Sequence, residues 1–218
     1  MITPIPRHIF LDFDGVVMDS MALKLDAYCH ALAEFGFTRA AVREQQLLYA
    51  GLSRARALPL MYKALSGGRE LSVDAQARVL ERFAEEDIRL RPRMTLMPGA
   101  EGFLEEAGRR GMPLTVVTGT PQEVVDGTVE RFGLRRFFRE VHGSPPLKSE
   151  HLAVLPARHG LLSTEALYVG DALQDINAAE SAGIPFVAVD HGDGAFDGRK
   201  PIATVKGLRE LPALLGWL

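Results

Sequence analysis

The strongest structural signal in this chain is the segment Phe10-Leu11-Asp12-Phe13-Asp14-Gly15-Val16. A short apolar run ends in two aspartates two positions apart, and a glycine follows them directly. If the run is a strand, side chains two apart point to the same side, so both carboxylates meet at its end. Such a pair can bind a divalent cation or divide the roles of nucleophile and general acid. Ordinary turn chemistry produces the same spacing, and this segment alone leaves that alternative open.

The bulk composition is that of a globular protein with a sizeable core. The chain has 218 residues, of which 47% are hydrophobic and 24% charged, and its net charge is −3. This charge offers no basic surface for nucleic acid or an acidic membrane. The single cysteine, Cys29, excludes an internal disulfide framework and a cysteine-rich metal site. We find no apolar run long enough to span a membrane and no signal-peptide pattern in residues 1–7, so we expect a cytoplasmic protein.

Short apolar runs alternate with helical patterns along most of the chain. This alternation indicates βαβ units and predicts an α/β fold with a Rossmann-like, doubly wound parallel sheet. A last amphipathic helix is expected over 207–218, docked on the core through its leucines and Trp217. The expected strands are His8–Phe13, Leu114–Thr118, Ala166–Val169 and Pro185–Val189, and the expected helices are Ala100–Arg110, Gln122–Arg131, Ser149–Arg158 and Gln174–Ala182.

One long interval interrupts this alternation. Between Met21 and Arg93 the apolar residues recur at i, i+3 and i+4, over 22–35, 54–65 and 73–90, and glycines separate these helical patterns. We therefore predict a helical domain over residues 19–94, inserted into a core made of residues 1–18 and 95–218.

Polar residues follow successive strands at the point where each is expected to end. They are Asp12 and Asp14, then Thr118-Gly119-Thr120, then Asp171 with Asp175 four positions on, while Lys148 lies in the preceding loop. In open α/β sheets, ligands bind outside the carboxyl ends of the strands, so these groups should face one crevice. Each residue has an ordinary alternative role: Asp171, Asp175 and Thr118 as helix caps or surface residues, and Lys148 as a solvated loop lysine. Those roles do not explain why all of them align at strand ends.

Each group has a use in the hydrolysis of a phosphate monoester, a reaction that needs up to about 10²¹-fold acceleration. Carboxylates from Asp12, Asp171 and Asp175 can hold Mg²⁺, and the Lys148 ammonium can neutralise further charge. The Thr118 hydroxyl and the backbone around Gly119 can contact phosphoryl oxygens. One aspartate can then attack phosphorus while the other transfers protons.

Taken together, these segments resemble the haloacid dehalogenase superfamily of hydrolases with a helical cap, in its phosphatase, phosphoglycolate phosphatase and β-phosphoglucomutase-like branch. The resemblance covers nearly the whole chain through Asp-Phe-Asp-Gly-Val-Val, Val-Val-Thr-Gly-Thr, Lys148 and Val-Gly-Asp-Ala-Leu-Gln-Asp. It implies that Asp12 is the nucleophile, Asp14 the acid/base, and Thr118 and Lys148 the phosphoryl-binding residues. It also implies Mg²⁺ on the Asp12 carboxylate, the Asp14 backbone carbonyl and Asp171, with Asp175 either a ligand or a residue behind the ligands.

Within this superfamily Asp14 distinguishes the reactions. Dehalogenases and phosphonatases lack a carboxylate at this place, so its presence favours phosphoryl transfer. One departure is Lys148-Ser149, where many phosphatases have proline after the lysine; we expect a change in loop stiffness without loss of chemistry.

The resemblance also implies substrate contacts from the cap. Lys24, where β-phosphoglucomutase-like proteins tend to carry histidine, favours an anionic substrate. Arg54, with Arg56 as the alternative, could hold a carboxylate or second phosphate bidentately. Gly119 and Thr120 are expected beside the phosphoryl group. Surface exposure is the competing interpretation for Lys24 and both arginines.

We therefore expect a Mg²⁺-dependent phosphatase acting on a small phosphorylated metabolite, such as a sugar phosphate or a phosphoglycolate-like compound, through an aspartyl-phosphate. The alternatives are a phosphomutase of the β-phosphoglucomutase type and, more remotely, a non-catalytic binding protein on the same fold. The expected partner is the small-molecule ester, with no nucleic acid or membrane, and the expected assembly is a monomer or homodimer.

Overall fold

The central feature of the protein is a six-stranded parallel sheet. The computed structural model describes residues 2, 4–196 and 198–217, and orders the strands β5-β4-β1-β6-β7-β8. The α/β, doubly wound class predicted from the sequence is confirmed. The strands are β1 (His8–Leu11), β4 (Leu114–Pro121), β5 (Glu140–Ser144), β6 (Ala166–Gly170), β7 (Phe186–Val189) and β8 (Ala203–Val205).

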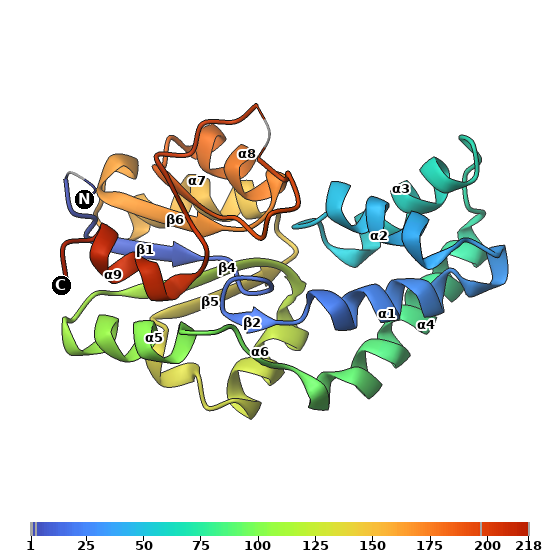
Figure 1. Cartoon of the computed structure of the whole chain (residues 1–218), viewed down its shortest axis with the longest axis horizontal. Helices are drawn as coiled ribbons and strands as arrows, with labels where there is room; N and C mark the ends of the chain where they lie inside the picture. Colours follow the sequence, from blue (N-terminus) through green and yellow to red (C-terminus); the bar gives the residue numbers. More distant parts are fainter. Residues whose placement is uncertain (1, 3, 197, 218) are drawn as a thin grey trace.

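Strand β1 lies in the middle of the sheet because its side chains are buried on both faces. Ile9 pairs with Leu114 of β4 on one side and with Leu167 of β6 on the other. Figure 1 shows helices on both faces of the sheet, and the core beneath them divides into two apolar clusters. The longer covering helices are α5 (Ala100–Arg109) and α6 (Gln122–Arg131) on one face, and α7 (Lys148–Arg158) and α8 (Leu173–Ala182) on the other.

A separate bundle of helices lies at the C-terminal end of β1 (Figure 1). A two-stranded antiparallel ribbon, β2 (Met18–Asp19) with β3 (Thr95–Leu96), connects the bundle to the sheet. The bundle has its own apolar cluster, in which Tyr28 and Phe83 pack at 4.7 Å between ring centroids. No helix in the described part of the chain has both the length and the hydropathy to cross a membrane. The helices are α1 (Met21–Ala31), α2 (Arg39–Leu48), α3 (Arg54–Leu65) and α4 (Val73–Leu90).

Several elements differ from those expected. Strand β5 was not predicted because its segment is polar, and β8 was not predicted because it has only three residues. Helix α2 was not predicted because its inward face consists of Val42 and the polar Gln46. The expected helix over 207–218 was wrong in extent: a 3₁₀ turn at Leu208–Glu210 precedes the short helix α9 (Leu211–Leu214). Gly216 adopts φ +70° just after α9, which ends the helix, and Leu218 lies outside the described residues.

The buried His8 at the start of β1 makes stability depend on pH. Its side chain is 1% exposed, stacks between Phe10 and His159, and lies 2.9 Å from the Thr115 hydroxyl through Nε2. Burial, and secondarily the neighbouring His159 and Arg139, lower its pKa from 6.5 to about 4. Between pH 6.5 and pH 4, His8 is therefore protonated in the unfolded chain but remains neutral in the folded protein. Because the unfolded state binds the extra proton, the free energy of unfolding decreases as the pH falls toward 4.

We expect His8 to contribute up to about 3 kcal/mol to this loss. The measurement is the free energy of unfolding in denaturant, for wild type and His8→Phe, at a series of pH values. The stability advantage of wild type over the variant should shrink below pH 6.5. A constant difference between pH 7 and pH 4 would contradict the assignment.

Candidate active site

The C-terminal ends of the strands bring most of the predicted site residues to one cavity. Residues from the helical bundle, including Tyr49 and the loop at Gly51-Leu52, form its other wall. The predicted residues that line it are Asp12, Asp14, Lys24, Thr118, Gly119, Thr120, Lys148 and Asp171. Asp175 lies behind this surface and Arg54 lines an adjoining cavity.

Asp12 and Lys148 form a buried ion pair at the floor of the cavity. Lys148 Nζ lies 2.8 Å from Asp12 Oδ2, and the Phe13 N–H donates to Asp12 Oδ1 at 2.7 Å. Lys148 is the first residue of α7, so a helix terminus fixes its backbone where a loop had been expected. Burial lowers the pKa of Lys148, but the carboxylates of Asp12 and Asp175 outweigh this and raise it above its ordinary value. Lys148 is therefore a permanent cation beside Asp12.

Asp175 holds this lysine from behind. It is fully buried, and its Oδ1 accepts hydrogen bonds from Lys148 Nζ and from the Tyr168 hydroxyl, both at 2.6 Å. Its Oδ2 accepts the Ala172 N–H at 3.0 Å, which also caps α8. Tyr168 was not singled out from the sequence; the available signal was a tyrosine inside an otherwise apolar strand, where a buried hydroxyl needs a partner.

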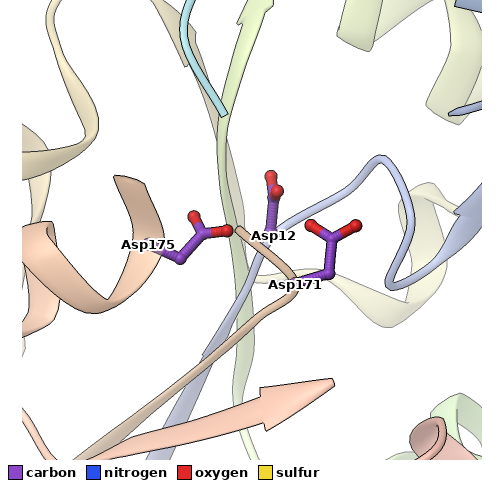
Figure 2. A group of neighbouring side chains, drawn as sticks. All are labelled: Asp12, Asp171 and Asp175. Atoms are coloured by element: carbon purple, nitrogen blue, oxygen red, sulfur yellow. The ribbon is translucent and has the colours of Figure 1, made fainter. Parts of the chain in front are cut away.

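Three carboxyl groups gather around this point. One oxygen each from Asp12, Asp171 and Asp175 lie within 4.8 Å of one another, and Figure 2 shows the Asp175 group pointing toward Asp12. Burial raises the pKa of Asp12 to about 8, and the other carboxylates add to this while Lys148 opposes it. Burial and Asp175 also raise the pKa of Asp171. One ammonium thus faces three carboxyl groups, an excess of negative charge that a divalent cation with oxygen ligands would relieve.

Asp14 occupies a different environment on the side toward the helical bundle. Ser20 Oγ donates to its Oδ1 at 2.5 Å, while Lys24 Nζ and Thr120 Oγ1 contact its Oδ2, each at 2.6 Å. Burial raises its pKa, but the Lys24 charge and the three hydrogen-bond donors more than offset this and hold it below its ordinary value. The pKa of Asp12 is therefore raised and the pKa of Asp14 is lowered, although both residues lie just after β1.

Two glycines allow backbone to pack closely at the site. Gly15 has φ +78°, and a Cβ there would collide with the Asp171 carboxylate. A Cβ on Gly119 would collide with the Gly51 carbonyl of the helical bundle. The buried Thr118 hydroxyl accepts the Thr120 N–H at 3.2 Å, so it also stabilises the irregular end of β4, where the strand register shifts between Val117 and Pro121.

The adjoining cavity extends from Asp14 and Lys24 into the bundle and contains Arg54. The Arg54 guanidinium lies 5.7 Å from the centre of the Phe83 ring and 4.0 Å from Asp87, which also pairs with Arg91 at 2.6 Å. Asp87 and Arg91 were not singled out from the sequence, because charged residues in helices are usually solvated. Arg56 is exposed and lines a separate groove beside Lys148.

Comparison with known proteins identifies the family. The model of the haloacid dehalogenase-like hydrolase family matches residues 9–189. The chain therefore belongs to the haloacid dehalogenase-like hydrolase family, and the resemblance stated from its motifs is confirmed.

Curated relatives are phosphatases. The chain is 30% identical over 189 residues to a phosphoglycolate phosphatase of Synechococcus elongatus, covering 85% of this chain and 84% of that protein. It is 27% identical over 213 residues to phosphoglycolate phosphatase 1 of Pseudomonas aeruginosa, covering 92% and 74%. At this level the predicted enzyme class, a phosphatase of this family, is confirmed.

Solved structures share the fold. A predicted phosphoglycolate phosphatase from Haemophilus somnus matches with a TM-score of 0.82 at 22% identity, over 97% of this chain and 99% of that one. CbbY from Rhodobacter sphaeroides, solved in complex with phosphate, matches with a TM-score of 0.75 at 19% identity, over 94% and 96%. Both likenesses include the sheet and the helical bundle, because they span nearly the whole chain.

Proposed function

We propose that the protein is a Mg²⁺-dependent phosphatase that hydrolyses a small, anionic phosphate monoester through an aspartyl-phosphate on Asp12. The observation that carries this proposal is the Asp12 carboxylate, held 2.8 Å from Lys148 at the floor of a cavity that Asp14 also lines. Nucleophile, cation and acid/base thus surround one space, as phosphoryl transfer requires.

In the first step Asp12 attacks phosphorus, a bond forms between them, and the bond to the ester oxygen breaks. Asp14 gives its proton to the departing oxygen. In the second step water attacks phosphorus, Asp14 takes a proton from it, and the bond to Asp12 breaks to release inorganic phosphate. In both steps Lys148 offsets negative charge on the phosphoryl oxygens, and the Thr118 hydroxyl donates a hydrogen bond to them.

The cation would be held by Asp12, Asp171 and the Asp14 backbone carbonyl. When bound, Mg²⁺ neutralises the phosphate dianion and keeps Asp12 in its nucleophilic, ionised form. We assign Asp175 to Lys148 rather than to the metal, because three donors already occupy its two oxygens.

The contacts of Asp14 constrain the substrate. With three donors on its carboxylate, Asp14 is in the ionised form that the second step needs. To act as the acid in the first step, it must exchange one donor for a proton. A carboxylate or phosphate on the leaving group would draw Lys24 away from Asp14 and favour that exchange. This requirement, with Arg54 deeper in the cavity, supports an anionic leaving group of the phosphoglycolate or sugar-phosphate kind.

The test is phosphate release with Mg²⁺ from phosphoglycolate, sugar phosphates, nucleotides and an aryl phosphate whose aryl group is uncharged. We expect kcat/KM to be highest for esters with a second anionic group. Conversion of a sugar 1-phosphate through a bisphosphate, without net phosphate release, would instead support a β-phosphoglucomutase-type mutase. Ligand binding without turnover of any compound would support a non-catalytic protein.

Arg54→Ala is expected to raise KM by about 10-fold for the best substrate with an anionic leaving group and to leave KM for the aryl phosphate nearly unchanged. The reason is that the aryl group has no anion for the guanidinium to bind. Arg78→Ala, which removes an exposed arginine of α4 that lines neither the site nor the adjoining cavities, is the control and should change neither constant. Equal effects of Arg54→Ala on both substrates would remove Arg54 from substrate recognition.

A further inference from the structure

His191 enters the site from a segment to which the sequence analysis assigned no function. It lies just beyond β7 in an exposed loop, yet its side chain is only 29% exposed. The Asp190 carboxylate accepts the Gly192 N–H at 2.8 Å and pairs with Lys206 at the same distance. These two contacts fix the backbone on either side of His191, so the ring is anchored where the loop meets the active site.

The ring joins two parts of the candidate metal site. His191 Nε2 lies 3.0 Å from the Gly15 carbonyl oxygen and 3.5 Å from Asp171 Oδ2. A carbonyl only accepts hydrogen bonds, so this nitrogen carries a hydrogen. Gly15 directly follows Asp14, whose backbone carbonyl is a proposed ligand, and Asp171 is a proposed carboxylate ligand. His191 therefore connects the turn after β1 to the loop after β6.

The orientation of the Asp171 carboxylate is fixed by fewer side-chain and backbone contacts than the orientations of Asp12 and Asp175. Asp12 accepts two hydrogen bonds or ion pairs and Asp175 accepts three. Among the described residues, His191 is the one side chain whose hydrogen-bonding or charged atoms contact the Asp171 carboxylate. Without the imidazole, its orientation would be set by rotamer preference and by its packing against Gly15 alone.

We propose that His191 is a positioning residue that orients Asp171 and the Asp14-Gly15 turn for binding a divalent cation. The inference rests on the metal site of the proposed function. Groups that hydrogen-bond to metal ligands fix ligand orientation in advance, and their loss typically weakens metal affinity about 10- to 100-fold. His191 does not line the cavity that contains Asp12 and Lys148, so it acts on the ligands and not on the substrate.

The experiment measures Mn²⁺ binding directly, by the electron paramagnetic resonance signal of the free ion, with no substrate present. His191→Leu should weaken Mn²⁺ binding at least about 10-fold, while His191→Gln, which keeps an N–H donor, should recover most of the affinity. Asp193→Asn is the matched control: it removes a charge from the same loop, and its side-chain oxygen can still accept the Ala195 N–H. It should bind Mn²⁺ as wild type does.

A second measurement separates positioning from a general structural defect. At saturating Mg²⁺, His191→Leu should keep a near wild-type substrate KM and melting temperature, while the Mg²⁺ concentration for half-maximal activity rises. Equal Mn²⁺ affinity in wild type and His191→Leu would overturn the inference and leave the proposed function intact. A wild-type protein that binds no Mn²⁺ or Mg²⁺ would overturn the metal site itself.

Discussion

Asp12→Asn is expected to lower the phosphatase kcat by at least about 10⁴-fold, because an amide cannot form the phosphoryl-enzyme. The substitution preserves shape, and it removes a carboxylate whose pKa burial raises to about 8. We therefore expect the variant to fold and to melt at or above the wild-type temperature. The measurement is steady-state phosphate release with the best substrate, together with a thermal melt.

Asp74→Asn provides the control for this variant. Asp74 lies in the first turn of α4, exposed and remote from the cavity, so both kcat and melting temperature should match wild type. A folded Asp12→Asn protein that retains wild-type turnover would overturn the assignment of the nucleophile.

Lys148→Met is expected to destabilise the protein as well as inactivate it. The Lys148 side chain is 5% exposed, and its ammonium pairs with Asp12 at 2.8 Å and Asp175 at 2.6 Å. Its removal leaves a cluster of buried carboxyl groups without a cation, and breaking a buried pair in this way typically costs about 3–5 kcal/mol. We expect a loss of that size in the free energy of unfolding, measured with a metal chelator present.

Added Mg²⁺ distinguishes the charge effect from lost packing. If the carboxyl groups are the cause, Mg²⁺ should stabilise Lys148→Met more than it stabilises wild type. Lys63→Met, which breaks the exposed pair with Glu70, should leave the stability unchanged with and without Mg²⁺. A Lys148→Met protein as stable as wild type in chelator would show that the lysine does not compensate these carboxylates.

The sequence was sufficient for the elements whose burial pattern is simple. Strand β6 is a short, fully buried run, and α4 has a regular inward-facing stripe that ends at the buried Leu90, so both could be placed from the pattern of hydrophobic residues. Strand β5 could not be read in this way, because the segment Glu-Val-His-Gly-Ser is an edge strand with polar side chains. Helix α2 was missed because it buries a glutamine, Gln46, whose amide donates to the Met21 carbonyl.

The candidate site likewise contains residues that could be predicted from the sequence and residues that could not. Residues at strand ends could be placed together, since parallel strands bring their carboxyl ends to one edge of the sheet. Tyr168 and His191 could not be assigned to the site from the sequence, because their roles depend on individual hydrogen bonds to other segments of the chain. The opposite pKa shifts of Asp12 and Asp14 were equally inaccessible, because they depend on which side chains surround each carboxylate.

The position of β1 between β4 and β6 has a consequence for the order of assembly. A ribosome releases Asp12 early, but the flanking strands and the partners Lys148 and Asp171 are all synthesised later. Contacts within the helical bundle are closer in sequence and can form first, whereas β1 must wait for both neighbours. The residue proposed to begin the chemistry is thus among the first to leave the ribosome and among the last to reach its native surroundings.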